Sequence, residues 1–256
     1  MIQDFPLSEQ SAPRIVAREL LAMVGSGLLY PFGLAASKKR TPRRRLQRTV
    51  VLVHGYLGNR STLFPLAAYL KLRGVGELID FDYRSTEGIE PAAIALREFL
   101  RRRVRGGRVD LVCHSLGGLV ARVYLQELGG ARRVDRCITL GTPHHGTYNA
   151  YWVASRVGRE LRPDSRLLAR LDATRSVARA VRFTSIVAGS DNIVVPRVFA
   201  GAHDENAPGR DDVLHLPDLG HVGMLFSPRV FRAVAERLLK GPTLVSAASA
   251  TKENSP

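Results

Sequence analysis

The serine at position 115 lies in the sequence LVCHSLGGLV, between an apolar run and a Gly-Gly step (residues 111–120). A serine hydroxyl placed where a strand meets a helix can attack an acyl group, provided that a base removes its proton. A serine before a helix is also a common N-cap, which needs no further partner. The chemical interpretation of Ser115 therefore requires a histidine, an acid and a pair of amide donors elsewhere in the chain.

The neighbours of Ser115 have the sizes that a sharp strand-to-helix turn demands. In such a turn the two backbones nearly touch, so the positions two before and two after the serine must be small. Cys113 and Gly117 occupy these positions. The usual pattern is G-x-S-x-G, and this chain departs from it at the first glycine, although cysteine is small enough to fit. The departure lowers the specificity of the motif taken alone.

A second turn, VLVHGYLGN (residues 51–59), can supply the amide donors. Glycines let backbone amides approach a ligand closely, and acyl transfer needs such amides where the carbonyl oxygen gains charge. We expect the oxyanion donors to be the backbone amides of Leu116 and Tyr56, with Leu57 as the alternative to Tyr56. Read in isolation, the same residues could also be a plain turn.

The base is expected downstream of the serine, since an acid and then a histidine follow the nucleophile in this type of site. His221 follows the last expected strand and a turn, HLPDLGH, where a side chain would emerge at the carboxyl edge of a sheet. The other histidines lie before the serine, beside it, too soon after it, in a polar loop or inside a strand: His54, His114, His144, His145, His203 and His215. His221 is therefore the predicted base.

The acid is expected after the preceding strand. TSIVAGSDNIVVP places Asp191 just beyond an apolar run, where its carboxylate would hold the imidazole tautomer and stabilise the imidazolium. Its rivals are Asp204, Asp211, Asp212 and Asp218. Asp218 is three residues before His221, and we expect it to shape that turn instead.

Apolar runs that alternate with helix-period segments must position these residues. The expected strands are residues 49–55, 76–83, 108–114, 134–141, 181–189 and 211–217. Helices are expected from about 61 to 73, from Pro91, after Ser115, and from His221 to about 239. Near-continuous apolar strands alternating with helices indicate an α/β fold, with a mostly parallel sheet of about six strands covered by helices on both faces.

Three segments flank or interrupt this pattern. Residues 148–180, rich in Arg, Leu and Ala, predict a small helical cap inserted in a domain that spans 49–240. Residues 241–256 predict a disordered tail. Residues 1–48 form an apolar segment and a basic linker. Within it, residues 20–36 carry no charge, and Gly25, Gly27, Pro31 and Gly33 weaken a single straight helix.

Two interpretations of residues 20–36 remain open: a short membrane anchor or interfacial helix, and an apolar arm packed on the domain. The basic run that follows favours contact of residues 20–48 with an anionic membrane surface. The basic run also favours a cytoplasmic location for the domain. Secretion is the alternative, but residues 1–19 lack the positively charged start of a signal peptide.

The charge balance is strongly basic, with 38 Lys and Arg against 23 Asp and Glu, a net charge of +15. Such a surplus can attract nucleic acid, but no aromatic and basic recognition module accompanies it, so we expect no nucleic-acid partner. Cys113 and Cys137 each lie in an apolar strand-like run, which predicts buried free thiols. No metal-ligand spacing is present, and we expect neither metal nor cofactor.

Three stretches, VHGYLGN, CHSLGG and TLGTPHHGT (residues 139–147), give the chain a resemblance to a known family. From about Thr49 to Leu239 it resembles the bacterial triacylglycerol lipase and esterase group of the α/β-hydrolase superfamily, and it is similar to inositol-deacylase-like lipases. The resemblance implies a Ser115–His221–Asp191 triad and the oxyanion donors given above. Relatives often bind calcium through an aspartate after the histidine, whereas HVGMLFSP offers none.

The resemblance also implies a substrate pocket. Its expected wall residues are His54, Leu57, His114, His144 and His145. The expected activity is hydrolysis of carboxylic esters with lipid-like acyl chains through an acyl-enzyme. An acyltransferase or thioesterase could use the same triad, and a binding protein could keep the fold without turnover.

Overall fold

Six parallel strands form the centre of the protein, as the alternating sequence pattern predicts. The computed structural model describes residues 12–34, 48–104, 106–196 and 211–239. The strands are β1 (Thr49–Val53), β2 (Glu77–Phe81), β3 (Val109–His114), β4 (Val134–Leu140), β5 (Arg182–Ala188) and β6 (Asp211–Leu216). Each expected strand is confirmed to within about two residues, the usual uncertainty of element ends.

The strands pair in the order β2-β1-β3-β4-β5-β6. The chain therefore moves outward from β1 to β2 and then returns to the other side of β1 with β3. In open parallel sheets, ligands bind beyond the carboxyl ends of the strands at the point where the order reverses. Here that point lies between β1 and β3, and the loops that leave it carry His54 and Ser115.

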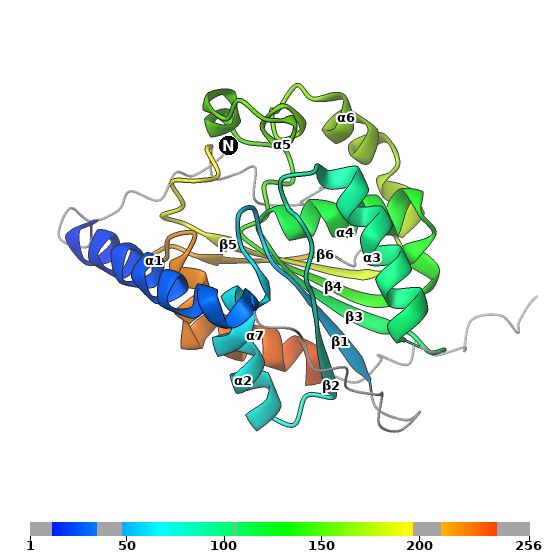
Figure 1. Cartoon of the computed structure of the whole chain (residues 1–256), viewed down its shortest axis with the longest axis horizontal. Helices are drawn as coiled ribbons and strands as arrows, with labels where there is room; N and C mark the ends of the chain where they lie inside the picture. The colour runs from blue at the N-terminus through cyan, green and yellow to red at the C-terminus, as the bar shows by residue number, and fades with distance from the viewer. Residues whose placement is uncertain (1–11, 35–47, 105, 197–210, 240–256) are drawn as a thin grey trace, which may run out of the picture.

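Helices cover both faces of the sheet, as expected (Figure 1). They are α2 (Phe64–Leu72) and α7 (Pro228–Leu239) on one face, and α3 (Ile89–Arg103) and α4 (Leu116–Glu127) on the other. Because successive strand residues point to opposite faces, Val51 and Val53 join the core beneath α3 and α4. Val50 and Leu52 join the core beneath α2 and α7. All four side chains are buried.

Three helix starts differ in detail from the sequence expectation. The helix expected from His221 is instead a 3-10 turn, η6 (Gly223–Phe226), followed by α7, which begins at Pro228. The helix expected from residue 61 begins as a 3-10 turn, η1 (Arg60–Leu63), which the side chain of Asn59 caps, and continues as α2. The helix expected to open at Pro91 begins two residues earlier, at Ile89, which leaves Pro91 within the first turn, where its missing N–H costs nothing.

The segment between β4 and β5 is helical, as predicted for residues 148–180. It consists of η3 (Tyr148–Trp152), α5 (Arg156–Glu160), α6 (Arg166–Ala173) and η4 (Arg175–Ala178). We refer to residues 148–178 as the inserted helices. Their role as a cap stays a prediction.

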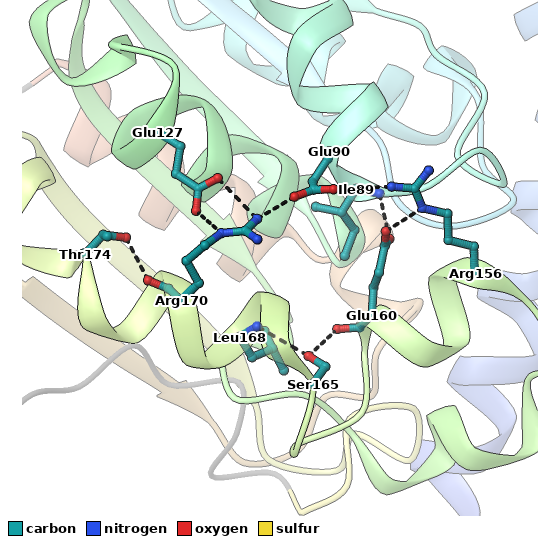
Figure 2. Close-up of polar contacts among 9 residues, drawn as sticks. All are labelled: Ile89, Glu90, Glu127, Arg156, Glu160, Ser165, Leu168, Arg170 and Thr174. Carbon is teal, nitrogen blue, oxygen red and sulfur yellow. Dashed lines mark hydrogen bonds and ion pairs between the residues drawn. The ribbon is translucent and has the colours of Figure 1, made fainter.

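Arginines tie the inserted helices to α3 and α4 (Figure 2). Arg170 pairs with Glu90 of α3 and, at 2.6 Å, with Glu127 of α4. Arg156 lies 2.8 Å from Glu160 and 3.3 Å from Glu90. The Glu160 carboxylate also accepts a 2.8 Å hydrogen bond from an amide of the first turn of α3.

Residues 12–34 form one continuous helix, α1 (Ala12–Leu34), although its glycines and proline were expected to weaken one. Pro31 lies in the last turn of α1. Its missing N–H therefore affects only the end of the helix, and the turns before it keep their hydrogen bonds. The large apolar side chains that α1 exposes are Val16, Leu20, Leu21, Met23, Val24, Leu28, Tyr30, Phe32 and Leu34. Ile15 and Ala22 are buried against the domain. The helix thus packs on the domain and keeps an apolar face exposed, which combines features of both interpretations.

Within the described residues, α1 is long and apolar enough to cross a membrane, a test that signal sequences and core helices can also pass. Several sequence predictions fall outside the described residues. They concern the basic run up to residue 47, the residues His203 and Asp204, and the tail from residue 241.

Candidate active site

The sequence around Ser115 folds as the sharp turn that its small neighbours predict. Ser115 follows β3 directly and has φ 52° and ψ −123°, a left-handed backbone that a non-glycine residue rarely adopts. A Cβ on Gly117 would lie 2.7 Å from the carbonyl oxygens of Val53 and His54. Only glycine therefore lets α4 approach β1 this closely. Strain of this kind concentrates at functional sites.

Two hydrogen bonds hold the turn in place. The Ser115 amide donates to the carbonyl of Leu140 at 2.8 Å. The Thr142 hydroxyl donates to the carbonyl of Ser115, also at 2.8 Å. The Ser115 side chain itself makes no capping hydrogen bond to the first turn of α4. The interpretation of Ser115 as a side-chain N-cap is therefore wrong, and α4 makes no hydrogen bond to its hydroxyl.

The predicted base and acid are brought together. His221 Nδ1 lies 2.7 Å from Oδ2 of Asp191. The other carboxylate oxygen accepts hydrogen bonds of 2.8 Å from the amides of Ile193 and Val194. Asp191 is 1% exposed and His221 is 5% exposed. These bonds fix the direction of the carboxylate, and a carboxylate at Nδ1 orients an imidazole so that Nε2 can act as a base.

The rival acids have other partners. Asp218 makes an exposed ion pair with Arg229 at 2.7 Å, and Asp212 pairs with Arg237. Asp204 lies outside the described residues, as does the side chain of Asp211. Among the described aspartates, Asp191 is the one that bonds to His221.

His221 lies beside the strand that carries the serine. Its ring centroid is 4.9 Å from that of His114, the residue before Ser115. His114 Nε2 is 3.4 Å from the carbonyl oxygen of His221. Burial, together with the neighbouring ring of His221, lowers the pKa of His114 to about 3. His114 is therefore neutral at physiological pH, and no imidazolium stands beside His221 to oppose its protonation.

The turn after β1, in which an oxyanion donor is expected, has an unusual backbone at Leu57. Leu57 has φ 55° and shares with Ser115 the property of being a non-glycine residue with positive φ. Its amide donates to the Ser85 hydroxyl at 2.9 Å, so the alternative donor already has a partner. Tyr56 keeps its place as the expected donor. Leu116 is the first residue of α4, and amides of a first turn have no partner inside the helix.

Two residues expected in the pocket wall are closed off from solvent. His54 and His144 are fully buried. His54 contacts the carbonyl of Gly55 at 2.9 Å and stacks on Tyr83 with 4.4 Å between ring centroids. The ring of His144 is 3.0 Å from the Thr139 hydroxyl. His54 Nε2 also accepts from the amide of Tyr83, beyond β2. Both rings bond to neighbouring protein groups and have no surface to offer a substrate.

The other expected wall residues are more accessible or lie next to the site. Leu57 is 62% exposed, and the side chain of His145 is 34% exposed and 3.6 Å from the Asp172 carboxylate. His114 is 5% exposed. Their role in a pocket wall stays a prediction.

Two residues that contact this site have no sequence feature that predicts the contact. Thr142 is one, although it lies in the TLGTPHHGT stretch that carried the family resemblance. Glu19 is the other: its carboxylate accepts hydrogen bonds from the amides of Val222 and Gly223. The sequence signal at Glu19 is a lone acidic residue at the edge of an apolar run, which does not indicate a partner so distant in the chain.

Cys113 and Cys137 are buried free thiols, as predicted. Burial raises the pKa of Cys113, so it fills the small position before Ser115 as a neutral side chain. Over the described part of the chain, no group of three or more His, Cys, Asp and Glu side chains is placed to hold a metal ion.

A comparison with known proteins bears on this arrangement. Residues 85–189 match the family model for palmitoyl protein thioesterase, a stretch that is less than half of the chain. It includes Ser115 and ends just before Asp191.

Solved structures with similar folds include several lipases and esterases. The mature form of a Bacillus licheniformis lipase matches with a TM-score of 0.61 and 18% identity, over 78% of this chain and 96% of that one. A Paleococcus ferrophilus monoacylglycerol lipase matches with a TM-score of 0.55 and 16% identity, over 74% and 93%. A Rhodococcus esterase gives 0.55 and 16%, over 78% and 93%. This protein therefore has the α/β-hydrolase fold, similar to that of these lipases and esterases.

Proposed function

We propose that the protein is a serine hydrolase that cleaves carboxylic esters. The observation that carries the proposal is the 2.7 Å contact between His221 Nδ1 and Asp191. The ring of His221 lies against that of His114, the residue before a serine held at positive φ. A serine in this backbone conformation, with its hydroxyl unused by α4, next to a carboxylate-oriented imidazole, is the arrangement that nucleophilic acyl transfer requires.

The geometry supports a two-step reaction. His221 takes the Ser115 proton as the hydroxyl oxygen attacks the ester carbonyl, and the oxyanion is held by the amides of Tyr56 and Leu116. The imidazolium, stabilised by Asp191, then protonates the leaving alcohol and leaves an acyl-enzyme. Water attacks the acyl carbon as His221 removes its proton, and return of that proton to Ser115 releases the acid.

Exposed apolar side chains near the acid loop favour a lipid-like acyl group. The amide of Tyr148 donates to the carbonyl of Val195 at 2.8 Å, so η3 lies against the segment that follows Asp191. Tyr148 and Trp152 of η3 are 54% and 89% exposed, and Ile193 is 44% exposed. Apolar surface of this kind suits an acyl chain better than a charged substrate.

Substitution of the nucleophile tests the proposal. Ser115→Ala should lower hydrolysis of p-nitrophenyl butyrate by about 10⁴-fold or more, since loss of a triad serine removes nearly all covalent catalysis. A fluorophosphonate probe should label Ser115 in the wild-type protein and leave the variant unlabelled. Full activity in the purified variant would overturn the proposal, and a wild-type serine that resists the probe would favour the non-catalytic binding protein.

A thioesterase is the second candidate, because the matched family model is that of palmitoyl protein thioesterase. The same triad would attack a thioester carbonyl, with a thiol in place of the alcohol as leaving group. The ratio of kcat/KM for an S-palmitoyl peptide to that for p-nitrophenyl palmitate separates the two. A ratio well above one favours the thioester, and a ratio well below one favours the oxygen ester. Transfer of the acyl group to an added alcohol would indicate an acyltransferase.

We also propose that α1, with the basic run after it, contacts an anionic membrane surface. Leu21 and Leu28 are 71% and 70% exposed, and an exposed apolar helix face next to basic residues is the pattern of interfacial binding. Leu21→Ser with Leu28→Ser should reduce sedimentation with phosphatidylserine vesicles. Leu72→Ser, at an 88% exposed position on α2, is the matched control and should leave it unchanged. The cytoplasmic location expected for the domain stays a prediction.

A further inference from the structure

Glu19 of α1 reaches the loop that carries His221. Its carboxylate oxygens accept hydrogen bonds from the amides of Val222 at 3.0 Å and Gly223 at 2.6 Å, the two residues directly after His221. A Cβ on Gly220 would lie 2.4 Å from Oε1 of Glu19, and one on Gly223 would lie 2.6 Å from it. The glycines on both sides of His221 thus leave the space that the carboxylate fills.

The contact joins elements far apart in the sequence. Figure 1 shows α1 beside the orange segment that follows β6, where the loop after His221 lies. Hydrogen bonds from amides to an ionised carboxylate are about twice as strong as those between neutral groups. Two of them, made by consecutive amides, fix the backbone position and the direction of the peptide planes that follow His221.

The other end of α1 contacts the expected oxyanion loop. The Asn59 side chain donates to the carbonyl of Tyr30 at 3.0 Å, and Arg60 Nε donates to the carbonyl of Gly33 at 3.1 Å. Asn59 is three residues after Tyr56. One helix therefore bonds to the segment that bears the base and to the segment that bears an oxyanion donor.

We propose that Glu19 is a positioning residue for His221, acting through the backbone of Val222 and Gly223. The inference rests on the function proposed above. The imidazole is oriented by its bond to Asp191, but the distance from Nε2 to the nucleophile also depends on where the loop backbone lies. Because catalysis is sensitive to misplacements of about 1 Å, a carboxylate that fixes the loop affects turnover without touching the substrate.

Kinetics of Glu19 variants test this role. Glu19→Ala should lower kcat for p-nitrophenyl butyrate by about 10-fold or more and leave KM within about twofold, because alignment of the base is needed in the transition state. Glu19→Gln keeps one acceptor oxygen and should fall between the wild type and Glu19→Ala.

Glu160 provides a matched control, because its carboxylate also accepts a hydrogen bond from a backbone amide. It bonds to the amide of Ile89 at 2.8 Å and is drawn in Figure 2. Glu160→Gln should leave kcat and KM unchanged. Hydrogen exchange over residues 220–226 should become faster in Glu19→Ala and stay at the wild-type rate in Glu160→Gln.

Different results would overturn the inference or the function beneath it. A folded Glu19→Ala protein with wild-type kcat overturns the positioning role while the hydrolase proposal stands. An equal kcat loss in Glu19→Ala and Glu160→Gln, with no partial rescue by Glu19→Gln, indicates general loss of structure and also overturns it. A wild-type protein that hydrolyses no ester or thioester overturns the proposed function, and the inference falls with it.

Discussion

Helix α1 and the inserted helices (residues 148–178) both lie outside the alternation of strands and helices, but they are attached to the domain in different ways. The inserted helices bury Leu167, Leu168 and Leu171 in the core beneath α3 and α4, and arginines reinforce the contact (Figure 2). Helix α1 leaves most of its large apolar side chains exposed. It bonds at two points, through Glu19 and through the carbonyls of its last turn.

The two kinds of attachment have different consequences: the inserted helices contribute to the stability of the domain, whereas α1 positions two of its loops. Burial of leucines contributes to the free energy of unfolding in proportion to the apolar area removed from water. Hydrogen bonds from a mostly exposed helix contribute little to that energy, but here they hold the loops on which the proposed chemistry depends. We therefore expect damage to the inserted helices to appear first in stability, and damage to α1 to appear first in activity.

The largest expected effect comes from the same substitution made in both regions. Leu171→Ala should lower the free energy of unfolding by about 2–5 kcal/mol, because the side chain is fully buried and leaves a cavity. Leu28→Ala, at a 70% exposed position, should change it by less than about 0.5 kcal/mol. Urea unfolding monitored by circular dichroism measures both. Equal losses would show that α1 is held by packing after all.

A smaller effect is expected where an acid ties α6 to α4. The Asp172 carboxylate accepts a 2.8 Å hydrogen bond from the buried guanidinium of Arg122. Burial tends to raise the pKa of Asp172, but the hydrogen bonds and charges of His145 and Arg122 together hold it below its ordinary value. Because the folded pKa is lowered, the ionised form stabilises the protein above about pH 4, and this stability is lost as the pH falls through the folded pKa.

Asp172→Asn should therefore cost about 1–2 kcal/mol at neutral pH, a value reduced from that of a buried pair because Asp172 is half exposed. The difference from the wild type should shrink as the pH falls below about 4. The control is Asp164→Asn. Among the described hydrogen bonds, the Asp164 carboxylate accepts one from the exposed Tyr151 hydroxyl. Urea unfolding at several pH values gives the comparison, and a pH-independent loss in Asp172→Asn would contradict the ion-pair account.

The smallest expected effect concerns the exposed ion pairs in Figure 2. Arg170→Gln should lower stability by at most about 1 kcal/mol, since such pairs are screened by solvent. About 0.5 M NaCl should remove most of the difference, because the Debye length falls to a few ångströms. Hydrogen exchange of α6 should rise with salt while that of residues 220–226 does not. If hydrogen exchange rises with salt both in α6 and in residues 220–226, the inserted helices and α1 are not attached in different ways.

The strands and the candidate triad could be predicted because their signals are local. A short, β-branched run such as TVVLV favours a strand buried on both faces, and the small residues around Ser115 follow from the approach of two backbones. Gly117 illustrates the point, since a Cβ there would meet the carbonyl of Val53. Asp191 and His221 were placed by their position after consecutive strands, because the carboxyl ends of parallel strands meet at one edge.

The burial of individual polar side chains and the contacts between distant segments could not be predicted from local sequence signals. His54 and His144 were expected to face a pocket, but the ring of His54 bonds to the segment after β2, the ring of His144 contacts Thr139 of β4, and both are closed off from solvent. The path of α1 depends on which loops it meets, so its glycines and proline did not predict one continuous helix.

The sequence alone indicated the order of strands and helices and the sharp turn at Ser115, because these depend on side-chain size and periodicity within a few neighbouring residues. It also indicated the expected base and acid, because each follows one of the last strands of a parallel sheet. Only the tertiary structure decided that Glu19 bonds to the amides of Val222 and Gly223, and that an apolar helix spans from that loop to Asn59. Backbone amides carry no sequence signal, so a side chain that bonds to them gives no sign of its partner until the chain has folded.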